Sequence, residues 1–256
     1  MRRVFITGSS DGLGLLAGTL LIDQGHRVVL HARNATRARG LHEKVPGCDA
    51  VVVGDVSTVA AMRSVADQVN ALGPFDAVIH NVALGTDQKR SLTDDDVTQL
   101  FAVNVVAPYV LTALITPPER LVYLSSDMHA AGDETLQDLQ WLTRRWNPSQ
   151  AYADTKLHDL ILALYLARCC PELQVNAVHP GWVPTRMGGR GAPDDLLEGA
   201  TTQAWLAVSD DPSATVSGRY FHHRRPKPCN AAASLESVQE RLIGYLVQVT
   251  GIRLPG

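Results

Sequence analysis

The chain has 256 residues, which is enough to bury the core of one α/β domain, and 45% of its residues are hydrophobic. A formal net charge of -3 argues against a nucleic-acid-binding surface, and no apolar run reaches the roughly 18 residues that a membrane span requires. The four cysteines have no metal-ligand spacing and Gly8 interrupts the apolar start of the chain, so we expect a cytoplasmic protein with reduced thiols, no bound metal and no signal peptide.

Short apolar segments alternate along the chain with longer amphipathic ones. The apolar segments are rich in Val, Ile and Leu, which suits parallel strands buried on both faces. We expect strands at Arg3–Thr7, Arg27–Ala32, Asp49–Val53, Ala77–His80, Arg120–Ser125, Gln174–His179 and Arg219–His222, and helices at Leu13–Asp23, Val59–Leu72, Asp95–Leu114, Ala151–Cys170 and Leu196–Ser209. This order predicts one α/β domain over residues 1–256, with a doubly wound parallel sheet of about seven strands and helices on both faces.

A glycine-rich loop joins the first expected strand to the first helix, in the run Thr7-Gly8-Ser9-Ser10-Asp11-Gly12-Leu13-Gly14. Glycines let the backbone approach a ligand closely, and the free N–H groups of the following helix favour a pyrophosphate. A plain tight turn would also use glycines, but the flanking strand and helix favour dinucleotide binding. Ser9 and Ser10 either donate to phosphate oxygens or cap the helix.

The end of the second strand indicates which dinucleotide is bound. An acidic residue there accepts a hydrogen bond from the ribose 2′-hydroxyl of NAD, whereas an arginine suits the 2′-phosphate of NADP. Here Ala32 is followed by Arg33, with Arg37 one helical turn further. We therefore expect NADP rather than NAD, the alternative being that both arginines are ordinary surface residues. After the third strand, Asp55 either accepts from the adenine amine or caps the next helix.

Tyr152 and Lys156 are four residues apart in a segment that we expect to be helical. This spacing brings the phenol and the ammonium together on one helix face. A fixed ammonium favours the phenolate and lowers a tyrosine pKa that is ordinarily about 10. The pair therefore indicates a tyrosine that exchanges protons near neutral pH, although the same spacing also occurs on solvated helix surfaces.

Together these features resemble the short-chain dehydrogenase/reductase family, whose fold is a single-domain Rossmann fold. The motifs that carry the resemblance occur in the family's order: Thr7–Gly14, Asp55-Val56, Asn104, Ser126, Tyr152-x-x-x-Lys156 and His179–Thr185. The long segment between Ser126 and Tyr152 is similar to that of the retinol dehydrogenase and protochlorophyllide reductase-like branch. Many members of that branch act on bulky apolar substrates.

The resemblance implies hydride transfer that interconverts a carbonyl and an alcohol. Tyr152 would be the general acid or base, Lys156 would lower its pKa and bind the nicotinamide ribose, and Ser126 would donate to the substrate oxygen. Asn104 would hold a water that links Lys156 to solvent. In isolation, Ser126 would be a turn residue and Asn104 a cause of a local helix bend. The cofactor contacts that the resemblance and the loop imply are Gly8, Ser9, Ser10, Gly12, Leu13, Gly14, Arg33, Arg37, Asp55, Val56, Asn81, Tyr152, Lys156, Pro180, Gly181, Val183 and Thr185.

Two regions depart from the family pattern. His80 and Ala83 flank Asn81 where many members have Asn and Gly, and Asp11 stands where some NADP-preferring members have a basic residue. Asp11 therefore weakens the expectation of NADP slightly.

Two segments border the expected substrate side, an insert at residues 127–150 and a glycine-rich flap at residues 184–200. Trp141 and Trp146 of the insert, with Trp182 and Met187 near the flap, either wall an apolar pocket or anchor the core. The expected partners are a small, apolar carbonyl or alcohol substrate and further copies of the chain in a homodimer or homotetramer, without nucleic acid. The alternative to an enzyme is a non-catalytic NADP(H)-binding sensor or scaffold of the same fold.

Overall fold

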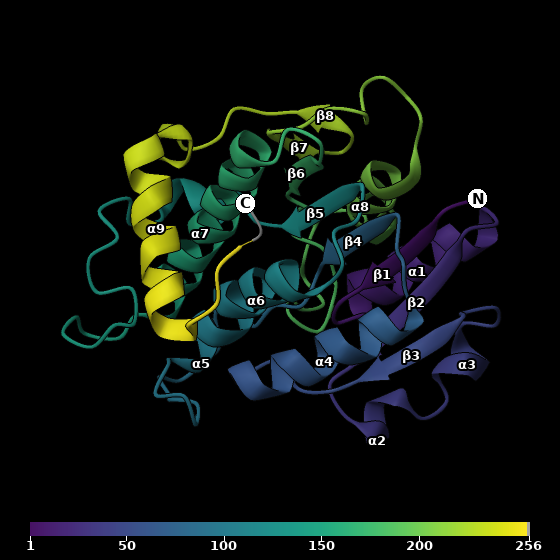
Figure 1. Cartoon of the computed structure of the whole chain (residues 1–256), viewed down its shortest axis with the longest axis horizontal. Helices are drawn as coiled ribbons and strands as arrows, with labels where there is room; N and C mark the ends of the chain where they lie inside the picture. The colour runs from purple at the N-terminus through teal and green to yellow at the C-terminus, as the bar shows by residue number, and fades with distance from the viewer. Residues whose placement is uncertain (255–256) are drawn as a thin grey trace.

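Eight strands form one sheet through the middle of the structure, a computed structural model that describes residues 1–254 (Figure 1). The strands are β1 (Arg3–Ile6), β2 (Arg27–Ala32), β3 (Ala50–Val53), β4 (Ala77–His80), β5 (Arg120–Leu124), β6 (Gln174–Val178), β7 (Arg219–His222) and β8 (Arg225–Pro226). Their order is β3-β2-β1-β4-β5-β6-β7-β8, and all neighbours are parallel except β7 and β8. The predicted doubly wound α/β fold is confirmed, with β8 as a short antiparallel addition to the expected strands.

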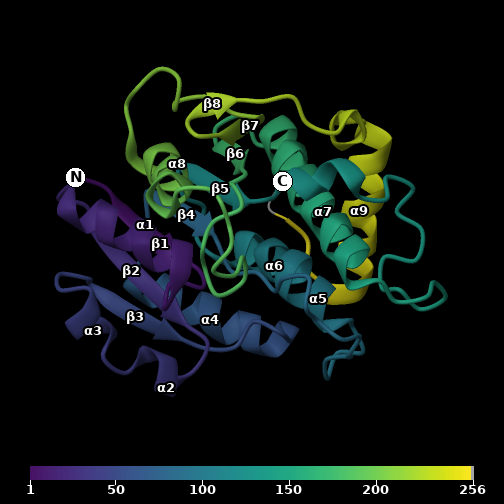
Figure 2. The same ribbon diagram turned by 180° about the vertical axis from the view of Figure 1, so that it is seen from behind.

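Helices cover both faces of this sheet (Figures 1 and 2). One face carries α1 (Gly12–Asp23) and α8 (Leu196–Val208), and the other carries α4 (Val59–Leu72), α6 (Ala107–Leu114), α7 (Pro148–Cys169) and α9 (Glu236–Thr250). The shorter elements are α2 (Ala35–Ala38), α3 (Leu41–Lys44), α5 (Gln99–Phe101), the π-helical turn η1 (Ala102–Val106), and the 3₁₀ turns η2 (Asp127–Ala131) and η3 (Ala231–Ser234).

The sheet separates two apolar cores, because successive strand residues face opposite sides. Phe5 and Val29 pack under α4, α6, α7 and α9, whereas Val4, Ile6 and Val28 pack under α1 and α8. All five side chains are fully buried. Burial of each such side chain stabilises the fold by about 1.5–3 kcal/mol, which explains why the strand segments are continuously apolar.

The predicted helix Asp95–Leu114 differs from the structure at its start and in its middle. It begins at Gln99, because Leu92 and Thr98 form a β-bridge and Asp96 has a left-handed φ of 58°. Asp95 instead accepts a hydrogen bond from the Val59 N–H at 2.6 Å, at the start of α4. The helix is then interrupted by the π-helical turn η1.

One long helix, α9, was not predicted. Its buried residues Val238, Leu242, Ile243 and Leu246 recur at helical spacing, so the signal was present in the sequence. At the far edge, β8 pairs antiparallel with β7 and contains Pro226, which limits further strand pairing there.

Among residues 1–254, no helix combines the length and the hydropathy that a membrane crossing requires. Nor does this part of the chain bring together three His, Cys, Asp or Glu side chains in a way that could hold a metal ion. The four cysteines are free thiols.

Candidate active site

A cavity of about 420 Å³ lies at the carboxyl ends of the central strands. It is close to the place where β1 and β4 are neighbours, at which the strand order reverses. Doubly wound sheets bind their ligands at this switch point. The cavity is lined at one end by Arg33 and Arg37, along its length by the glycine loop, and at the other end by Tyr152 and Lys156. The fold therefore brings the glycine loop, the two arginines and the tyrosine–lysine pair to one cavity, whereas Asn104 and Ser126 are not among the residues that line it.

The glycine loop follows β1 and is pressed against the chain that leaves β4. Gly8 has a φ of +62°, and a Cβ atom there would lie 2.8 Å from the Cα of Val82. A Cβ atom at Gly14 would lie 2.5 Å from Nδ2 of Asn81. Both distances are too short for any side chain, so the two glycines are required by the packing of the loop itself.

Asn81 holds this loop in place. Its two Nδ2 protons go to the carbonyl oxygens of Thr7 and Gly8, both at 3.0 Å, and its backbone N–H donates to Oγ1 of Thr7 at 2.9 Å. Asn81 also lines the cavity. Because its amide protons are already engaged, its side chain acts mainly on the shape of the loop.

The two serines of the loop lie on opposite sides of it. Ser9 is fully buried: its hydroxyl donates to the Ile6 carbonyl at 2.8 Å and accepts from the His31 N–H at 2.7 Å. Ser10 lines the cavity. Neither serine caps α1, because Asp11 takes that role with a 2.8 Å bond from the Gly12 N–H.

His31 is a cavity residue that the sequence reasoning missed. Its Nδ1 accepts a hydrogen bond from the Gly8 N–H at 2.9 Å, so the ring proton sits on Nε2, which lies 2.9 Å from the Gly54 carbonyl. Burial lowers the pKa of His31, which keeps the ring neutral. The imidazole thereby ties the glycine loop to the end of β3. A histidine inside an otherwise apolar strand was the available signal.

Arg33, Arg37 and Asp55 line the other end of the cavity. Arg37 Nη1 lies 3.7 Å from Asp11 Oδ2. The Asp55 carboxylate accepts from the Ser57 N–H at 2.7 Å, while Thr58 provides the N-cap of α4. Asp55 is therefore a turn residue beside the cavity and not the cap of the helix, which resolves one of its two predicted roles. Val56 lines the cavity next to it.

Tyr152 and Lys156 project from α7, whose N-cap is Asn147. Lys156 Nζ lies 5.7 Å from the centre of the Tyr152 ring, as the i,i+4 spacing predicts. The ammonium is buried and donates to the Leu124 carbonyl at 2.8 Å and to Asp159 Oδ2 at 2.7 Å. Asp159 was not among the predicted site residues.

The net pKa direction of Tyr152 differs from the expectation. Burial raises the pKa of the phenol, and this effect outweighs the lowering by the Lys156 ammonium and by a hydrogen bond with Ser126. The Asp159 carboxylate raises the pKa of Tyr152 further. The spacing of the sequence indicated the Lys156 ammonium, but neither the burial of the phenol nor the Asp159 carboxylate. The predicted lowering of the Tyr152 pKa therefore describes only one of several opposing effects.

Two serines follow β5. Ser126 caps η2, with its hydroxyl accepting from the Met128 N–H at 3.3 Å and donating to Asp127 at 3.2 Å. Ser125 lines the cavity, and its hydroxyl donates to the Lys156 carbonyl at 2.7 Å. Ser126 thus lies at the turn beside Tyr152, while Ser125 ties β5 to α7.

Asn104 lies in the π-helical turn η1 and is buried. Its Oδ1 accepts from the Leu84 N–H at 2.8 Å, and its Nδ2 donates to the Leu84 carbonyl and to Thr155 Oγ1, both at 3.0 Å. The side chain therefore joins the cavity wall at Leu84 to the residue before Lys156. This matches the expected local distortion of the helix, and the predicted water-holding role stays a prediction.

The chain after β6 forms the remaining wall. Pro180 and Thr185 line the cavity, whereas Gly181 and Val183 lie behind it. Gly181 has a φ of +93°, and a Cβ atom there would lie 2.8 Å from Asp194 Oδ2, so the turn requires glycine. Asp194 also accepts from the Trp182 N–H at 2.6 Å, which ties the flap back onto this turn.

The tryptophans of the insert act as packing anchors. Trp141 is buried and packs edge-on against Trp146, in a small cluster that includes Tyr152. Arg144 lies over the Trp141 ring at 3.9 Å and pairs with three carboxylates, at 3.1, 3.2 and 3.9 Å. Those carboxylates belong to Asp133, Asp138 and Asp154. The two indoles thus pack in the cluster that contains Tyr152 and do not line the cavity.

Several cavity residues near Tyr152 carry no recognisable motif, and sequence reasoning could not find them. They are Leu84, Gly85, Asp87, Gln88, Gln99, Val103, Ser125 and Arg186, together with Met187, which the sequence placed at the flap. This part of the lining therefore combines apolar and amide side chains with two charged ones, Asp87 and Arg186.

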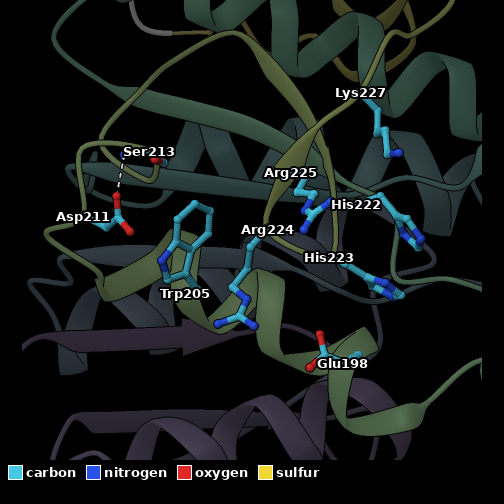
Figure 3. A pocket seen from close by; sticks show the side chains of 9 residues that line it. All are labelled: Glu198, Trp205, Asp211, Ser213, His222, His223, Arg224, Arg225 and Lys227. Atoms are coloured by element: carbon cyan, nitrogen blue, oxygen red, sulfur yellow. Dashed lines mark hydrogen bonds between the residues drawn. The ribbon is translucent and has the colours of Figure 1, made fainter.

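A second hollow, of about 610 Å³, lies between α8 and the hairpin of β7 and β8 (Figure 3). Its lining is polar and shares no residue with the cavity around Tyr152. The residues are Glu198, Trp205, Asp211, Ser213, His222, His223, Arg224, Arg225 and Lys227. Within residues 1–254 these side chains form no ion pair with one another, and the hollow contains no tyrosine or paired lysine. The chemistry predicted from the sequence therefore belongs to the first cavity.

Comparisons with known proteins agree with this geometry. A family model described as short chain dehydrogenase matches residues 2–121. An uncharacterized oxidoreductase of Emericella nidulans is 43% identical over 261 residues, covering 100% of both chains. Retinol dehydrogenase 13 of Homo sapiens is 26% identical and matches 99% of this chain and 86% of its own length. A crystal structure of an uncharacterized protein from Mycobacterium Paratuberculosis has a TM-score of 0.87 at 25% identity, covering 100% of this chain and 96% of that one.

Proposed function

This chain belongs to the short-chain dehydrogenase family of oxidoreductases, and we propose that it interconverts a carbonyl and an alcohol with NADP(H) as its cofactor. The observation that carries the proposal is a single cavity that has Arg33 and Arg37 at one end and Tyr152 and Lys156 at the other, with the glycine loop between them. A sensor of the same fold needs the first half of this cavity but has no use for a tyrosine–lysine pair at its other end.

The cavity residues fit a dinucleotide in chemical type and in order. The start of α1 offers backbone N–H groups beside Ser10, which suits a pyrophosphate. The guanidinium groups of Arg33 and Arg37 suit a phosphate, and the Asp55 carboxylate offers an acceptor next to Val56. A carboxylate at the end of β2, which would suit the free ribose hydroxyl of NAD, is replaced by Ala32 and Arg33.

Bound next to Tyr152, the nicotinamide ring would supply a hydride to the carbonyl carbon or accept one from the alcohol carbon. In the reductive direction the Tyr152 O–H donates its proton to the carbonyl oxygen, so the C=O bond becomes an alcohol. In the oxidative direction the phenolate accepts that proton. Ser126 donates a hydrogen bond to the same oxygen as negative charge develops on it.

Lys156 has two functions in this proposal. Its ammonium stabilises the phenolate that forms when Tyr152 gives up its proton. Two of its three protons go to Leu124 and Asp159, which leaves one for a ribose hydroxyl. Asn104 connects the residue before Lys156 to the wall at Leu84, and we propose that the neighbouring backbone holds the water that resupplies protons.

The substrate end of the cavity indicates a carbonyl compound with a mostly apolar body. Leu84, Val103 and Met187 provide apolar surface near Tyr152, and Gln88 and Gln99 add amide groups that can orient a polar substituent. The homodimeric or homotetrameric state and the location in the cytoplasm stay predictions from the sequence.

The test is a screen for NADPH oxidation, followed at 340 nm, against ketones, quinones and bulky aldehydes, with NADH in parallel. We expect turnover of at least one class, with NADPH preferred. Tight NADPH binding without turnover of any carbonyl in the panel, or of any alcohol with NADP, would favour the sensor function and contradict the proposal.

A further inference from the structure

A buried ion pair lies beside the proposed proton donor. Lys156 and Asp159 are one helical turn apart on α7, with Nζ and Oδ2 at 2.7 Å. Only 2% of the lysine side chain and 4% of the aspartate side chain are exposed. Lys156 lines the cavity. Asp159 does not line it and is bonded to the Lys156 ammonium.

Stability does not explain the carboxylate well. Buried ion pairs lose much of their attraction to desolvation and are weak evidence for stabilisation. Among the described residues, Lys156 is the one hydrogen-bond partner of the Asp159 carboxylate. Burial raises the pKa of Asp159 to about 6 even though the ammonium next to it opposes the rise. A leucine or alanine, like its neighbours on α7, would avoid this desolvation.

The charge of Asp159 acts on Tyr152. An uncompensated ammonium beside a phenol favours the phenolate, which cannot donate a proton. The carboxylate bonded to the same ammonium opposes that effect and raises the pKa of the phenol. Asp159 therefore limits how far the Lys156 ammonium lowers the pKa of Tyr152.

Resting on the function proposed above, we propose that Asp159 is a positioning residue: its carboxylate holds the Lys156 ammonium in the cavity wall and compensates its charge, so that the ammonium favours the Tyr152 phenolate less than it would alone. Lys156 keeps its proton because the buried carboxylate favours the ammonium over the neutral amine.

The other ionisable groups packed against α7 do not replace Asp159. Tyr123 of β5 is fully buried, and burial raises its pKa, so it stays neutral. His129 of η2 stays neutral because burial lowers its pKa, while Asp127 of the same turn acts on Tyr152 in the same direction as Asp159 but makes no bond to Lys156. The ionisable groups of α9 are engaged elsewhere: Glu236 and Glu240 with Arg168, Arg241 with the Thr135 carbonyl, and Tyr245 with Gln140.

The test compares Asp159→Asn with Asp154→Asn. Asn keeps the size and the acceptor oxygen at position 159 but removes the charge. Asp154 is a matched control, because it is also buried on α7 and also pairs with a cation, Arg144, yet makes no contact with Lys156. Asp159→Ser is the second variant in case the asparagine variant does not fold.

Two readouts follow the tyrosine itself. The first is the pH profile of kcat/KM for carbonyl reduction, whose high-pH limb reports loss of the phenol proton. The second is the phenolate absorbance near 295 nm, titrated as the difference between each protein and its Tyr152→Phe counterpart. Removing a negative charge stabilises the phenolate, so we expect both midpoints to fall by about one pH unit or more in Asp159→Asn, which is tenfold in the proton equilibrium. Asp154→Asn should leave both midpoints unchanged.

Unmoved or raised midpoints in folded Asp159→Asn and Asp159→Ser overturn the inference, as does an equal shift in Asp154→Asn. The absorbance titration needs no turnover. If the wild type reduces no carbonyl, the proposed reaction fails while the titration still decides whether Asp159 controls the phenol.

Discussion

Asp11 Oδ2 lies 3.7 Å from Arg37 Nη1, while Oδ1 of the same carboxylate accepts the Gly12 N–H at the start of α1. One side chain thus caps the helix and also faces a guanidinium that we propose to bind a 2′-phosphate. Both members of this pair are partly exposed, so its contribution to stability is at most about 1 kcal/mol. Its importance lies in ligand binding, because it brings a negative charge close to the position proposed for a phosphate.

Asp11→Asn should strengthen NADPH binding. Asparagine is also a good N-cap, so the helix keeps its start while the negative charge is removed. We expect the Kd for NADPH to fall about two- to fivefold, as the energy of an exposed pair allows, with a smaller change for NADH. Fluorescence titration with both cofactors measures this, and Asp23→Asn, at the other end of α1, is the control. A weaker affinity for NADPH would show that Asp11 positions Arg37 for the phosphate instead of competing for it.

Arg33→Ala should weaken the binding of NADPH much more than the binding of NADH. A hydrogen bond to a charged group contributes about 1.5–3 kcal/mol, so the Kd for NADPH should rise about tenfold or more while that for NADH changes little. Arg39→Ala is the matched control, since Arg39 follows α2, donates to Thr36 and does not line the cavity. Equal losses for NADPH and NADH in Arg33→Ala would refute the proposed phosphate contact.

Tyr152→Phe should remove turnover and leave cofactor binding nearly intact. General acid catalysis contributes about 10²–10⁴ in rate, so we expect kcat to fall at least a hundredfold while the Kd for NADPH changes less than about threefold. Tyr165→Phe, on the same helix but outside the cavity, should retain activity. Retained turnover in Tyr152→Phe would assign the proton donor to another group.

Gly14→Ala should damage the glycine loop although alanine favours helices. The new Cβ atom would lie 2.5 Å from Asn81 Nδ2 and 2.9 Å from the Gly8 carbonyl. The hydrogen bonds of Asn81 to the Thr7 and Gly8 carbonyls would therefore have to break. We expect a lower Tm and weaker binding of NADPH and NADH alike. Gly244→Ala is the control, because that glycine lies in α9 with no atom within 4 Å of the new Cβ, and it should stabilise the protein by about 0.5–1 kcal/mol. Unchanged dinucleotide binding in Gly14→Ala would show that the Asn81 hydrogen bonds do not shape the loop for binding.

The folded insert should become less stable at acid pH because of Asp138. Burial would raise its pKa, but hydrogen bonds from the backbone N–H groups of Arg144, Thr143 and Leu142 lower it to about 2. A carboxyl group whose folded pKa lies below its unfolded value stabilises the folded state above the unfolded pKa, near 4, and loses that effect as the pH falls toward 2. Asp138→Ala should therefore speed proteolysis within residues 127–150 at pH 7 and remove the acid dependence of that cleavage. Glu134→Gln, an exposed change in the same insert, should have neither effect.

The strands and the catalytic-side helix could be predicted from the sequence because their signals are local. The bounds of β2, β4 and β7 agree with the prediction, because runs such as Arg27–Ala32 are apolar at nearly every buried position, with His31 as the exception. The spacing of Tyr152 and Lys156 also needs one helix and nothing else. The helix α9 shows that a regular apolar pattern can still be overlooked when no recognised motif lies in it.

Other features depend on partners that are far away in the sequence. The sequence placed Ser9 among the ligand contacts, but its burial against β2 arises only when the strands meet. The bonds of Asn81 to Thr7 and Gly8, which shape the loop beside the cavity, depend on the same meeting of strands. The net pKa direction of Tyr152 depends on the depth of the site, which composition does not give. Asp159 had a sequence signal, a carboxylate one turn after Lys156 in a largely apolar part of the helix, but its role depends on the buried ion pair that only the structure shows.

Arg144 attaches the insert to α7. This one guanidinium joins Asp133 and Asp138 of the insert to Asp154, which lies two residues after Tyr152 on α7. Many changes in the sequence of the insert should therefore be tolerated as long as this arginine and its carboxylates are kept.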